Sequence, residues 1–418
     1  MSFEPPFYDD DPEAEVPPEA PEPSETPEPV EEDTTPAPPR HGRARDRVRR
    51  RRERQTGTTP PLGRGLSHLN RQTTFNWRMP NVQIPQVRWI AYVIGGAALI
   101  IAVVLLLGRL KNDQPQAHPN AVWIGTEWTY ELHEPEVVDE LVERLRDHQI
   151  GTIYAWVSWL QGDETWRGAE NFAAVRQFAE QFKEAYPEAQ LFGWLSFPVN
   201  MGENNYRLDN EELQQNIADF SARVVSDLGF DGIFLNIEPV WNGDENMLGL
   251  LRRVRLSIGE SVPIAVAIPP DWSPLDAAIP LPPLIAPGTV WDKEYKQNVA
   301  LLADQMAIMA YNSGLNSESN FTPEDYSQWT AYQVTAFIEA VSELGAGTQL
   351  FIGIPTYEAE PPGHDPAVEN VASAIEGVKL GLAQAGEAAA YVEGLAIYAG
   401  WTTDDLEWLQ FKSLWVNR

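Results

Sequence analysis

Eight short apolar runs recur along residues 121–418, each followed by a stretch long enough for a helix and its loops. Runs of this length, rich in β-branched and aromatic residues, favour strands. The runs are residues 121–125, 151–157, 190–195, 229–237, 262–268, 305–311, 349–354 and 394–398. Strands that alternate with helices form parallel sheets, and eight such units close into a barrel. The sequence therefore predicts an α/β fold, a (β/α)8 TIM barrel, over residues 121–418.

Two of the intervening stretches carry the apolar stripe of an amphipathic helix. The first is residues 136–148, with Val137, Val138, Leu141, Val142 and Leu145 on one face. The second is residues 171–186, with Phe172, Val175, Phe178 and Phe182. Both are expected to cover the outside of the barrel.

The predicted strand at residues 229–237 runs directly into a carboxylate, Glu238. Because side chains alternate along a strand, Phe234, Asn236 and Glu238 share one face. Strand ends at the carboxyl side of such a barrel build its active site, so Glu238 is expected at the barrel mouth. Apolar neighbours there would raise its pKa toward that of a general acid. The alternative is that Asn236 and Glu238 only hydrogen-bond a neighbouring loop.

The N-terminal part, residues 1–88, has the composition of a disordered tail. Residues 1–39 are acidic and rich in proline, and residues 40–54 are rich in arginine. Such segments bury too little apolar surface to offset their conformational entropy. The arginine-rich segment leaves open a second role in binding nucleic acid or anionic lipid.

Residues 89–107 contain no charged side chain and are about as long as the ~20 residues that cross a bilayer as a helix. The sequence therefore predicts one transmembrane helix at residues 89–110 and a linker at residues 111–120. A buried soluble helix is the alternative. Basic residues lie mainly before this helix, which predicts a single-pass cell-membrane protein with a cytoplasmic N-terminus and an extracytoplasmic C-terminal domain.

A net charge of −31 makes nucleic acid an unexpected partner for the C-terminal domain and favours neutral or cationic ligands. The absence of cysteine excludes disulfides and thiolate metal sites. With only six histidines, a histidine-rich metal centre is not expected, and neither is an organic cofactor. The sequence does not indicate an oligomeric state.

Residues 231–238, DGIFLNIE, resemble the DGxDxDxE signature of glycoside hydrolase family 18, the chitinase-like barrels. Asp231, Gly232 and Glu238 match, whereas Phe234 and Asn236 stand where that family has aspartates. The Asn-x-Glu ending is similar to the endo-β-N-acetylglucosaminidases of family 85. Both families are built on the same barrel.

Further resemblances follow in the same order along the chain. Residues 309–312, MAYN, resemble the family's Met-x-Tyr-Asp, with Asn312 in place of Asp, and residues 351–357 resemble its Gly-x-Pro-x-Tyr segment. Tyr398, at the end of the last strand, stands where the family usually has a tryptophan that floors the sugar site. Trp401 is the candidate to replace that tryptophan. The third strand, residues 191–197, lacks the usual Ser-x-Gly-Gly.

The resemblance implies hydrolysis in which the substrate's own 2-acetamido oxygen attacks the anomeric carbon. Glu238 would then be the general acid, Asn236 would hold the acetamido N–H, and Tyr311 would donate to the acetamido oxygen. Tyr311 can equally be a core tyrosine with a satisfied hydroxyl. The expected substrate-binding residues are Trp401, Tyr398, Asn312, Met309 and Trp194. The expected function is that of a membrane-anchored extracytoplasmic glycoside hydrolase cleaving β-linked N-acetylglucosamine glycans.

Two other functions remain open. A catalytically inactive, lectin-like barrel would bind a glycan without cleaving it. A two-carboxylate cell-wall glycosidase would pair Glu238 with another acid, such as Glu127 or Glu358. Asp231 is expected to be structural because it lies at the opposite end of its strand from Glu238. Trp241 and Trp272 are further indoles near strand ends.

Overall fold

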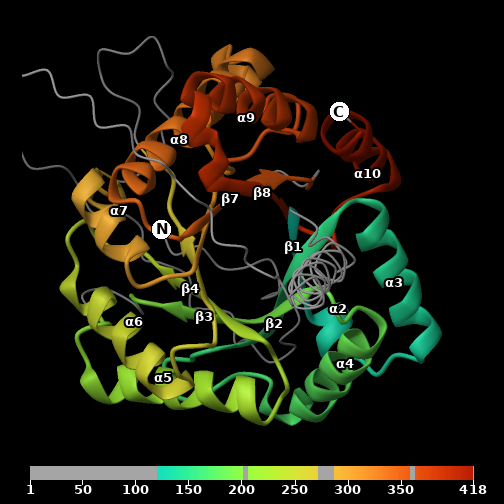
Figure 1. Cartoon of the computed structure of the whole chain (residues 1–418), viewed down its shortest axis with the longest axis vertical. Coiled ribbons are helices and arrows are strands. Elements are labelled where there is room, and N and C mark those ends of the chain that lie inside the picture. Colours follow the sequence, from blue (N-terminus) through green and yellow to red (C-terminus); the bar gives the residue numbers. More distant parts are fainter. Residues whose placement is uncertain (1–119, 201–205, 272–286, 358–362, 418) are drawn as a thin grey trace, which may run out of the picture. The chain divides into compact units, whose positions relative to one another are not determined.

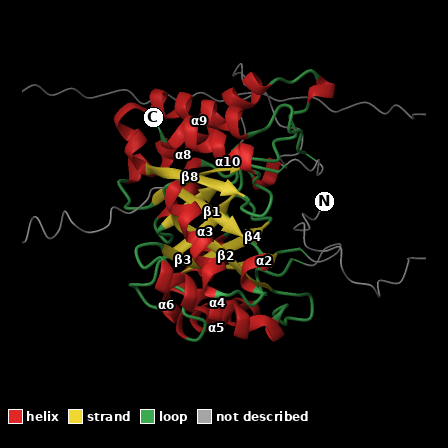
Figure 2. Ribbon diagram, turned by 90° about the vertical axis from the view of Figure 1, so that its right-hand side faces the viewer, coloured by secondary structure: helices red, strands yellow, loops and turns green. Residues whose placement is uncertain are grey.

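The computed structural model describes residues 120–200, 206–271, 287–357 and 363–417, and these ranges contain a closed barrel of eight parallel strands. The strands neighbour one another in sequence order, and β1 pairs with β8. They are β1 (Asn120–Ile124), β2 (Ile150–Trp159), β3 (Gln190–Pro198), β4 (Gly232–Glu238), β5 (Ile264–Ile268), β6 (Gln305–Ile308), β7 (Gln349–Pro355) and β8 (Val392–Tyr398). Their arrows point to one end of the barrel (Figure 2). The predicted (β/α)8 fold is confirmed.

Helices surround the strands as an outer ring (Figure 1). They are α2 (Thr126–Thr129), α3 (Pro135–Asp147), α4 (Phe172–Ala185), α5 (Glu211–Ser226), α6 (Glu245–Ile258), α7 (Lys293–Ala300), α8 (Pro323–Leu344), α9 (Val371–Ala385) and α10 (Asp405–Phe411). The helices predicted at residues 136–148 and 171–186 correspond to α3 and α4, each beginning and ending within a residue of the expected position.

The predicted tail and the transmembrane helix at residues 89–110 lie outside the described residues. Within the described ranges, no helix combines the length and apolar character needed to cross a bilayer. Asn120, expected as the last linker residue, is instead the first residue of β1. Its buried Oδ1 accepts hydrogen bonds from the backbone N–H of Leu395 (3.1 Å) and from Nε1 of Trp415 (2.8 Å). This side chain therefore ties the first strand to the last strand and to the C-terminal segment.

Aromatic side chains fill the inside of the barrel, and alanines leave room for them. The interior cluster includes Trp123, Tyr154, Trp156, Phe192, Trp194, Phe234 and Phe351 together with Ala121, Ala265, Ala267, Ala307, Ala396 and Ala399. The rings of Tyr154 and Phe234 stack with centroids 4.2 Å apart, and Trp123 meets Phe234 edge-on at 5.7 Å. Phe234 is thus packed among aromatic rings inside the barrel.

The ends of the observed strands differ from the predicted ones by up to three residues, and β4 and β6 are two examples. β4 begins at Gly232 rather than at residue 229, because Gly229 has a left-handed backbone with φ of 84°. Asp231 lies before the strand, where its carboxylate accepts from the backbone N–H of Leu191 (3.0 Å) and pairs with Lys183 (2.5 Å). Its structural role is therefore as expected.

β6 is shorter than the predicted strand at residues 305–311, because it ends at Ile308. The backbone N–H of Ala310 bonds to the carbonyl of Ile308 (2.9 Å), and Asn312 adopts a positive φ of 53°. The four residues from Met309 to Asn312 therefore form a loop at the barrel mouth instead of the end of a strand.

Candidate active site

Glu238 is the last residue of β4, on the same strand face as Phe234 inside the barrel. The ladder between β3 and β4 places it opposite Pro198, at the carboxyl end where the strands open into the mouth. Burial raises the pKa of its carboxyl above the ordinary value, and a hydrogen bond from the Asn236 side chain offsets part of that rise. A carboxyl whose pKa is raised is suited to general-acid chemistry.

Asn236 lies two residues before Glu238 and points to the same side of the sheet. Its amide interacts with the Glu238 carboxyl. Its Oδ1 is buried and accepts no hydrogen bond from any residue that the structure describes. A buried acceptor without a partner costs about 1–3 kcal/mol, so this oxygen is a position at which a ligand N–H would be favoured.

Tyr311 and Tyr398 lie beside the acid as a stacked pair. Their ring centroids are 4.5 Å apart, with 10° between the planes. Burial raises the pKa of Tyr311 well above its ordinary value, and the nearby ionisable groups of Tyr398 and Glu238 raise it further. Burial and Glu238 also raise the pKa of Tyr398. Both phenols are therefore neutral O–H donors, electrostatically coupled to the carboxyl of Glu238.

The indoles of Trp194 and Trp401 lie roughly parallel, with centroids 6.3 Å apart, and Trp401 meets Tyr398 edge-on at 5.7 Å. Trp194 was expected at a strand end but lies within β3, 3% exposed, as part of the barrel interior. Its Nε1–H is buried without a hydrogen-bond acceptor among the described residues. Met309 and the half-buried Trp401 pack against the same interior cluster. The structure therefore brings the predicted site residues of β3, β4 and β8 together with Tyr311 and Met309.

Asn312, the remaining predicted residue, is fixed by a network that the sequence did not indicate. Glu369 is fully buried and accepts from the backbone N–H groups of Asn312 (2.6 Å) and Ser313 (2.9 Å). The hydroxyl of Ser313 also donates to Glu369 (2.6 Å). The hydroxyl of Tyr357 donates to Oδ1 of Asn312 (2.7 Å). Glu369 therefore fastens the loop after β6 to the segment that leads into α9.

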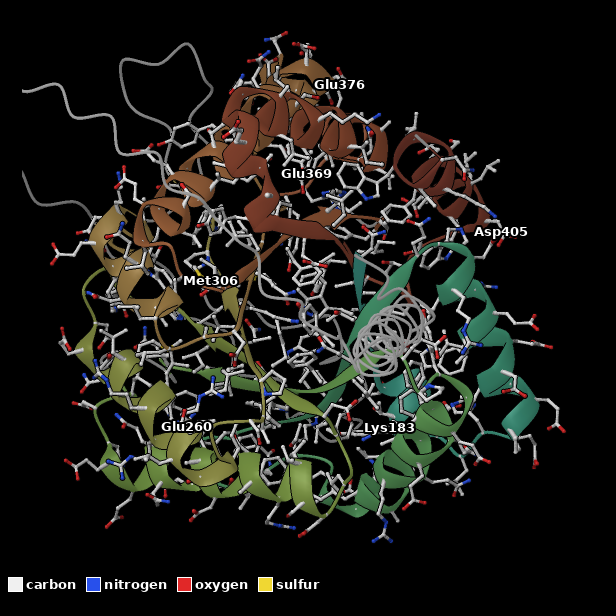
Figure 3. All side chains as sticks on the ribbon, viewed as in Figure 1. Lys183, Glu260, Met306, Glu369, Glu376 and Asp405 are labelled. Carbon is white, nitrogen blue, oxygen red and sulfur yellow. The ribbon has the colours of Figure 1, made fainter. Side chains whose placement is uncertain are left out.

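His364 completes this network from the loop after β7. Its Nδ1 faces Glu369 at 3.0 Å and its Nε2 faces the backbone carbonyl of Tyr357 at 2.9 Å. Both ring nitrogens of His364 therefore lie within hydrogen-bond distance of an oxygen, one from the Glu369 carboxylate and one from the backbone. Figure 3 labels Glu369 on the inner side of α9. The residues join only after folding, since Glu369 is 57 residues from Asn312, so no local sequence pattern predicts them.

Glu127, one of the two acids considered as a second carboxylate, does not contribute to the raised pKa of Glu238. Among the described residues, burial and Asn236 are the causes of its shift. The carboxylate of Glu127 accepts from the backbone N–H of Gly125 (3.0 Å), and its pKa is raised mainly by burial. Glu358 and Trp272 lie outside the described residues. No group of three or more His, Asp or Glu side chains in the described ranges is placed to hold a metal ion, and the expectation of no cofactor stays a prediction.

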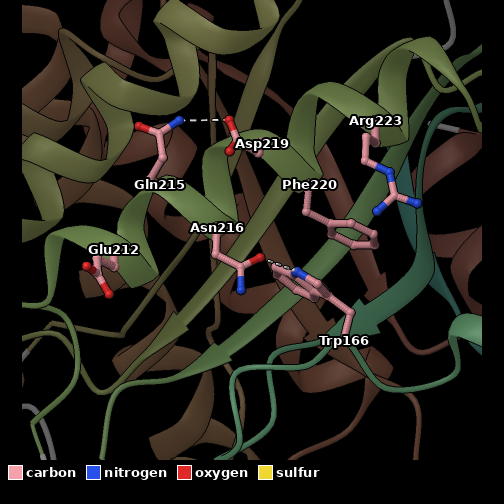
Figure 4. A pocket seen from close by; sticks show the side chains of 7 residues that line it. All are labelled: Trp166, Glu212, Gln215, Asn216, Asp219, Phe220 and Arg223. Atoms are coloured by element: carbon pink, nitrogen blue, oxygen red, sulfur yellow. Dashed lines mark hydrogen bonds between the residues drawn. The ribbon is translucent and has the colours of Figure 1, made fainter.

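A surface pocket of about 400 Å³ lies away from these residues, between α5 and Trp166 (Figure 4). The indole of Trp166 stacks on Phe220 at 4.1 Å and donates to Oδ1 of Asn216 (2.8 Å). Gln215 donates to Asp219 (2.7 Å). Because these polar groups already satisfy one another, the pocket is read as packing on the outer face of α5.

No family model and no curated protein matches the chain. Solved structures similar to it include the spore cortex-lytic enzyme SleL of Bacillus cereus, with 11% identity, a TM-score of 0.45, and coverage of 70% of this chain and 73% of that one. A class V chitinase from Pseudomonas fluorescens has 12% identity, a TM-score of 0.47, and coverage of 70% and 98%. A chitinase from Rhizomucor miehei has 16% identity, a TM-score of 0.42, and coverage of 72% and 100%. At these values the similarity concerns the fold alone.

Proposed function

We propose that this protein is a glycoside hydrolase that cleaves β-linked N-acetylglucosamine glycans by substrate-assisted, retaining hydrolysis. The supporting observation is that Oδ1 of Asn236, which has no hydrogen-bond partner among the described residues, lies beside Glu238, an acid whose pKa is raised. An acetamido N–H is a donor that would satisfy this oxygen. A glycan whose sugars lack a 2-acetamido group would leave it unsatisfied.

In the first step, the acetamido oxygen of the bound sugar attacks its own anomeric carbon while the bond to the leaving oxygen breaks. Glu238 gives its proton to that leaving oxygen. Asn236 accepts the acetamido N–H and so aligns the attacking oxygen, an orientation effect. The hydroxyl of Tyr311 donates to the acetamido oxygen. The product of the attack is a cyclic oxazolinium ion, which takes the place of a covalent intermediate between sugar and protein.

In the second step, Glu238 is ionised and takes a proton from water. The water oxygen attacks the anomeric carbon, and the oxazolinium ring opens. The acetamido group is restored, and the anomeric carbon has its original configuration. One carboxyl thus serves as acid and then as base, and no second carboxylate is required. Among the residues that the structure describes, no second acid contributes to the raised pKa of Glu238, which supports this proposal.

The proposal includes the cell-membrane arrangement expected from the sequence, with the helix at residues 89–110 as anchor and the barrel extracytoplasmic. A glycan of the cell wall or surroundings would then be within reach of the barrel. The supporting pattern is the uncharged stretch that follows the arginine-rich segment.

A matched pair of substrates tests the chemistry. Aryl chitobioside and aryl cellobioside have the same β-linked backbone but differ in the 2-acetamido groups. The full-length protein is expected to release the aryl group only from the chitobioside, and Glu238→Gln is expected to abolish release. Equal rates on the two substrates would contradict substrate assistance. Glycan binding without release would favour the lectin-like alternative.

A further inference from the structure

Trp241 is the only exposed aromatic side chain among the residues that the structure describes, with 43% of its surface uncovered. It stands three residues beyond Glu238, in the loop that leaves the carboxyl end of β4. Three residues of backbone span at most ~11 Å, which places it at the barrel mouth close to the acid. Other exposed large side chains include Leu256 in α6 and Leu409 in α10, which lie on the outer helices.

Hydrogen bonds hold the loop that carries Trp241 on both sides. Nε1 of Trp291 donates to the carbonyl of Val240 (3.0 Å), and the backbone N–H of Asp244 donates to the carbonyl of Trp241 (3.2 Å). Asn242 is bonded through its side chain as well: Nδ2 donates to Oδ2 of Asp292 (3.0 Å) and Oδ1 accepts from the Asp292 backbone N–H (2.9 Å). The loop therefore presents Trp241 in one fixed arrangement.

The indole also has a solid support beneath it. The backbone N–H of Asn242 bonds to the carbonyl of Gly288 (2.9 Å), which brings the segment before α7 against the loop. A Cβ atom at Gly288 would lie 2.4 Å from both Cε3 and Cζ3 of Trp241. Only glycine leaves room for the ring to lie on this backbone. The side chain is thus supported on one side and open to solvent on the other.

We propose that the exposed part of Trp241 is a platform on which a second sugar of the glycan stacks, next to the sugar whose bond Glu238 protonates. The inference rests on the proposed function and adds the binding position of a neighbouring sugar. A pyranose ring presents an apolar face of C–H groups, which suits an indole held in advance in one place. One isolated aromatic residue is too small a patch for a protein partner, whose interface would need a larger apolar core.

The test measures how affinity grows with glycan length. Full-length Glu238→Gln, which binds without turnover, is titrated calorimetrically with N-acetylglucosamine oligomers of one to six sugars. Adding Trp241→Ala is expected to lower affinity for the longer oligomers about tenfold and to remove most of the gain with length. Adding Trp241→Phe, which keeps a ring over Gly288, is expected to retain most of the gain. Leu256→Ala is the matched control for removing an exposed apolar side chain elsewhere.

The outcomes separate this proposal from the one on which it rests. If affinity rises with oligomer length as much in the Trp241→Ala protein as in its Glu238→Gln parent, the platform is overturned and the proposed function stands. If the parent binds no oligomer of any length, the proposed function is overturned and the platform with it. A loss confined to the Trp241→Ala protein, with Leu256→Ala unaffected, supports the platform.

Discussion

The Asn236 side chain hydrogen-bonds the carboxyl of Glu238, while its own Oδ1 lies buried with no donor among the described residues. The two residues face the same side of β4. The Asn236 amide thus contacts the Glu238 carboxyl and offers its Oδ1 as a hydrogen-bond acceptor to a ligand. Phe234, two residues before Asn236 on this face, stacks on the ring of Tyr154 in the barrel interior.

Replacing Asn236 by alanine is expected to lower kcat by about 10²- to 10³-fold, the usual cost of removing one positioned hydrogen-bonding group. The fold should persist, because the lost Oδ1 makes no hydrogen bond within the described protein. Steady-state hydrolysis and the thermal unfolding midpoint measure the two effects. Unchanged hydrolysis would rule out the assigned role of Asn236 even if the enzyme were active.

Glu238→Gln is expected to make stability less dependent on pH. The folded-state pKa of Glu238 is raised, so its contribution is complete below the unfolded value near 4.5 and is lost as the pH rises through the folded value. Relative to the unchanged chain, the variant should therefore gain free energy of unfolding as the pH rises above the unfolded value.

Urea unfolding at several pH values measures this difference. The pKa of Glu127 is raised in the same direction, but Glu127 is present in both proteins and cancels. A difference that stays constant across the range would show that the carboxyl of Glu238 titrates as it does in the unfolded chain.

Glu369→Gln is expected to lower the free energy of unfolding by about 2–3 kcal/mol and to reduce turnover. The amide turns one acceptor into a donor facing other donors and removes the charge beside His364. The loop that carries Asn312 and Ser313 would then loosen. Glu376→Gln, on the exposed face of α9, is the matched control and should change neither quantity (Figure 3). Equal stability and equal turnover of the two variants would show that the hydrogen bonds of Glu369 support neither property.

Gly353→Ala is expected to reduce turnover by displacing Tyr311. A Cβ at Gly353 would lie 2.7 Å from the carbonyl oxygen of Ile308 and 2.9 Å from Cε1 of Tyr311. Relief of this overlap should cost about 1–3 kcal/mol of stability. Gly347→Ala is the control, because open space surrounds its Cβ position. If Gly353→Ala leaves kcat unchanged while lowering stability, the position of Tyr311 does not matter for turnover.

The strands were predictable because each is apolar and continuous enough to be recognised alone. The alternation in β4 also predicted that Phe234, Asn236 and Glu238 share the interior face, and Phe234 does lie in the interior cluster. The ends of strands were less predictable. Gly229, before β4, and Asn312, after β6, adopt positive φ values that are incompatible with a strand. Because their neighbours are apolar, the sequence alone does not show that the strands exclude these residues.

The network around Glu369 could not be predicted, because its members come from separate loops and meet only in the folded barrel. Glu369 and His364 lie in a polar stretch between β7 and α9 that reads as a solvated loop. Their burial follows from tertiary contacts with the loop after β6. The sequence also indicated Trp194 as a residue at a strand end, whereas its place in the barrel interior depends on the length of β3.

The most direct test of the account is product analysis after incubating the full-length protein with chitin oligosaccharides, peptidoglycan and N-glycans, beside Glu238→Gln. The account predicts cleavage at N-acetylglucosamine linkages by the unchanged chain, with retained anomeric configuration, and none by the variant. Products that form equally with Glu238→Gln, or no product from any of these glycans, would contradict it.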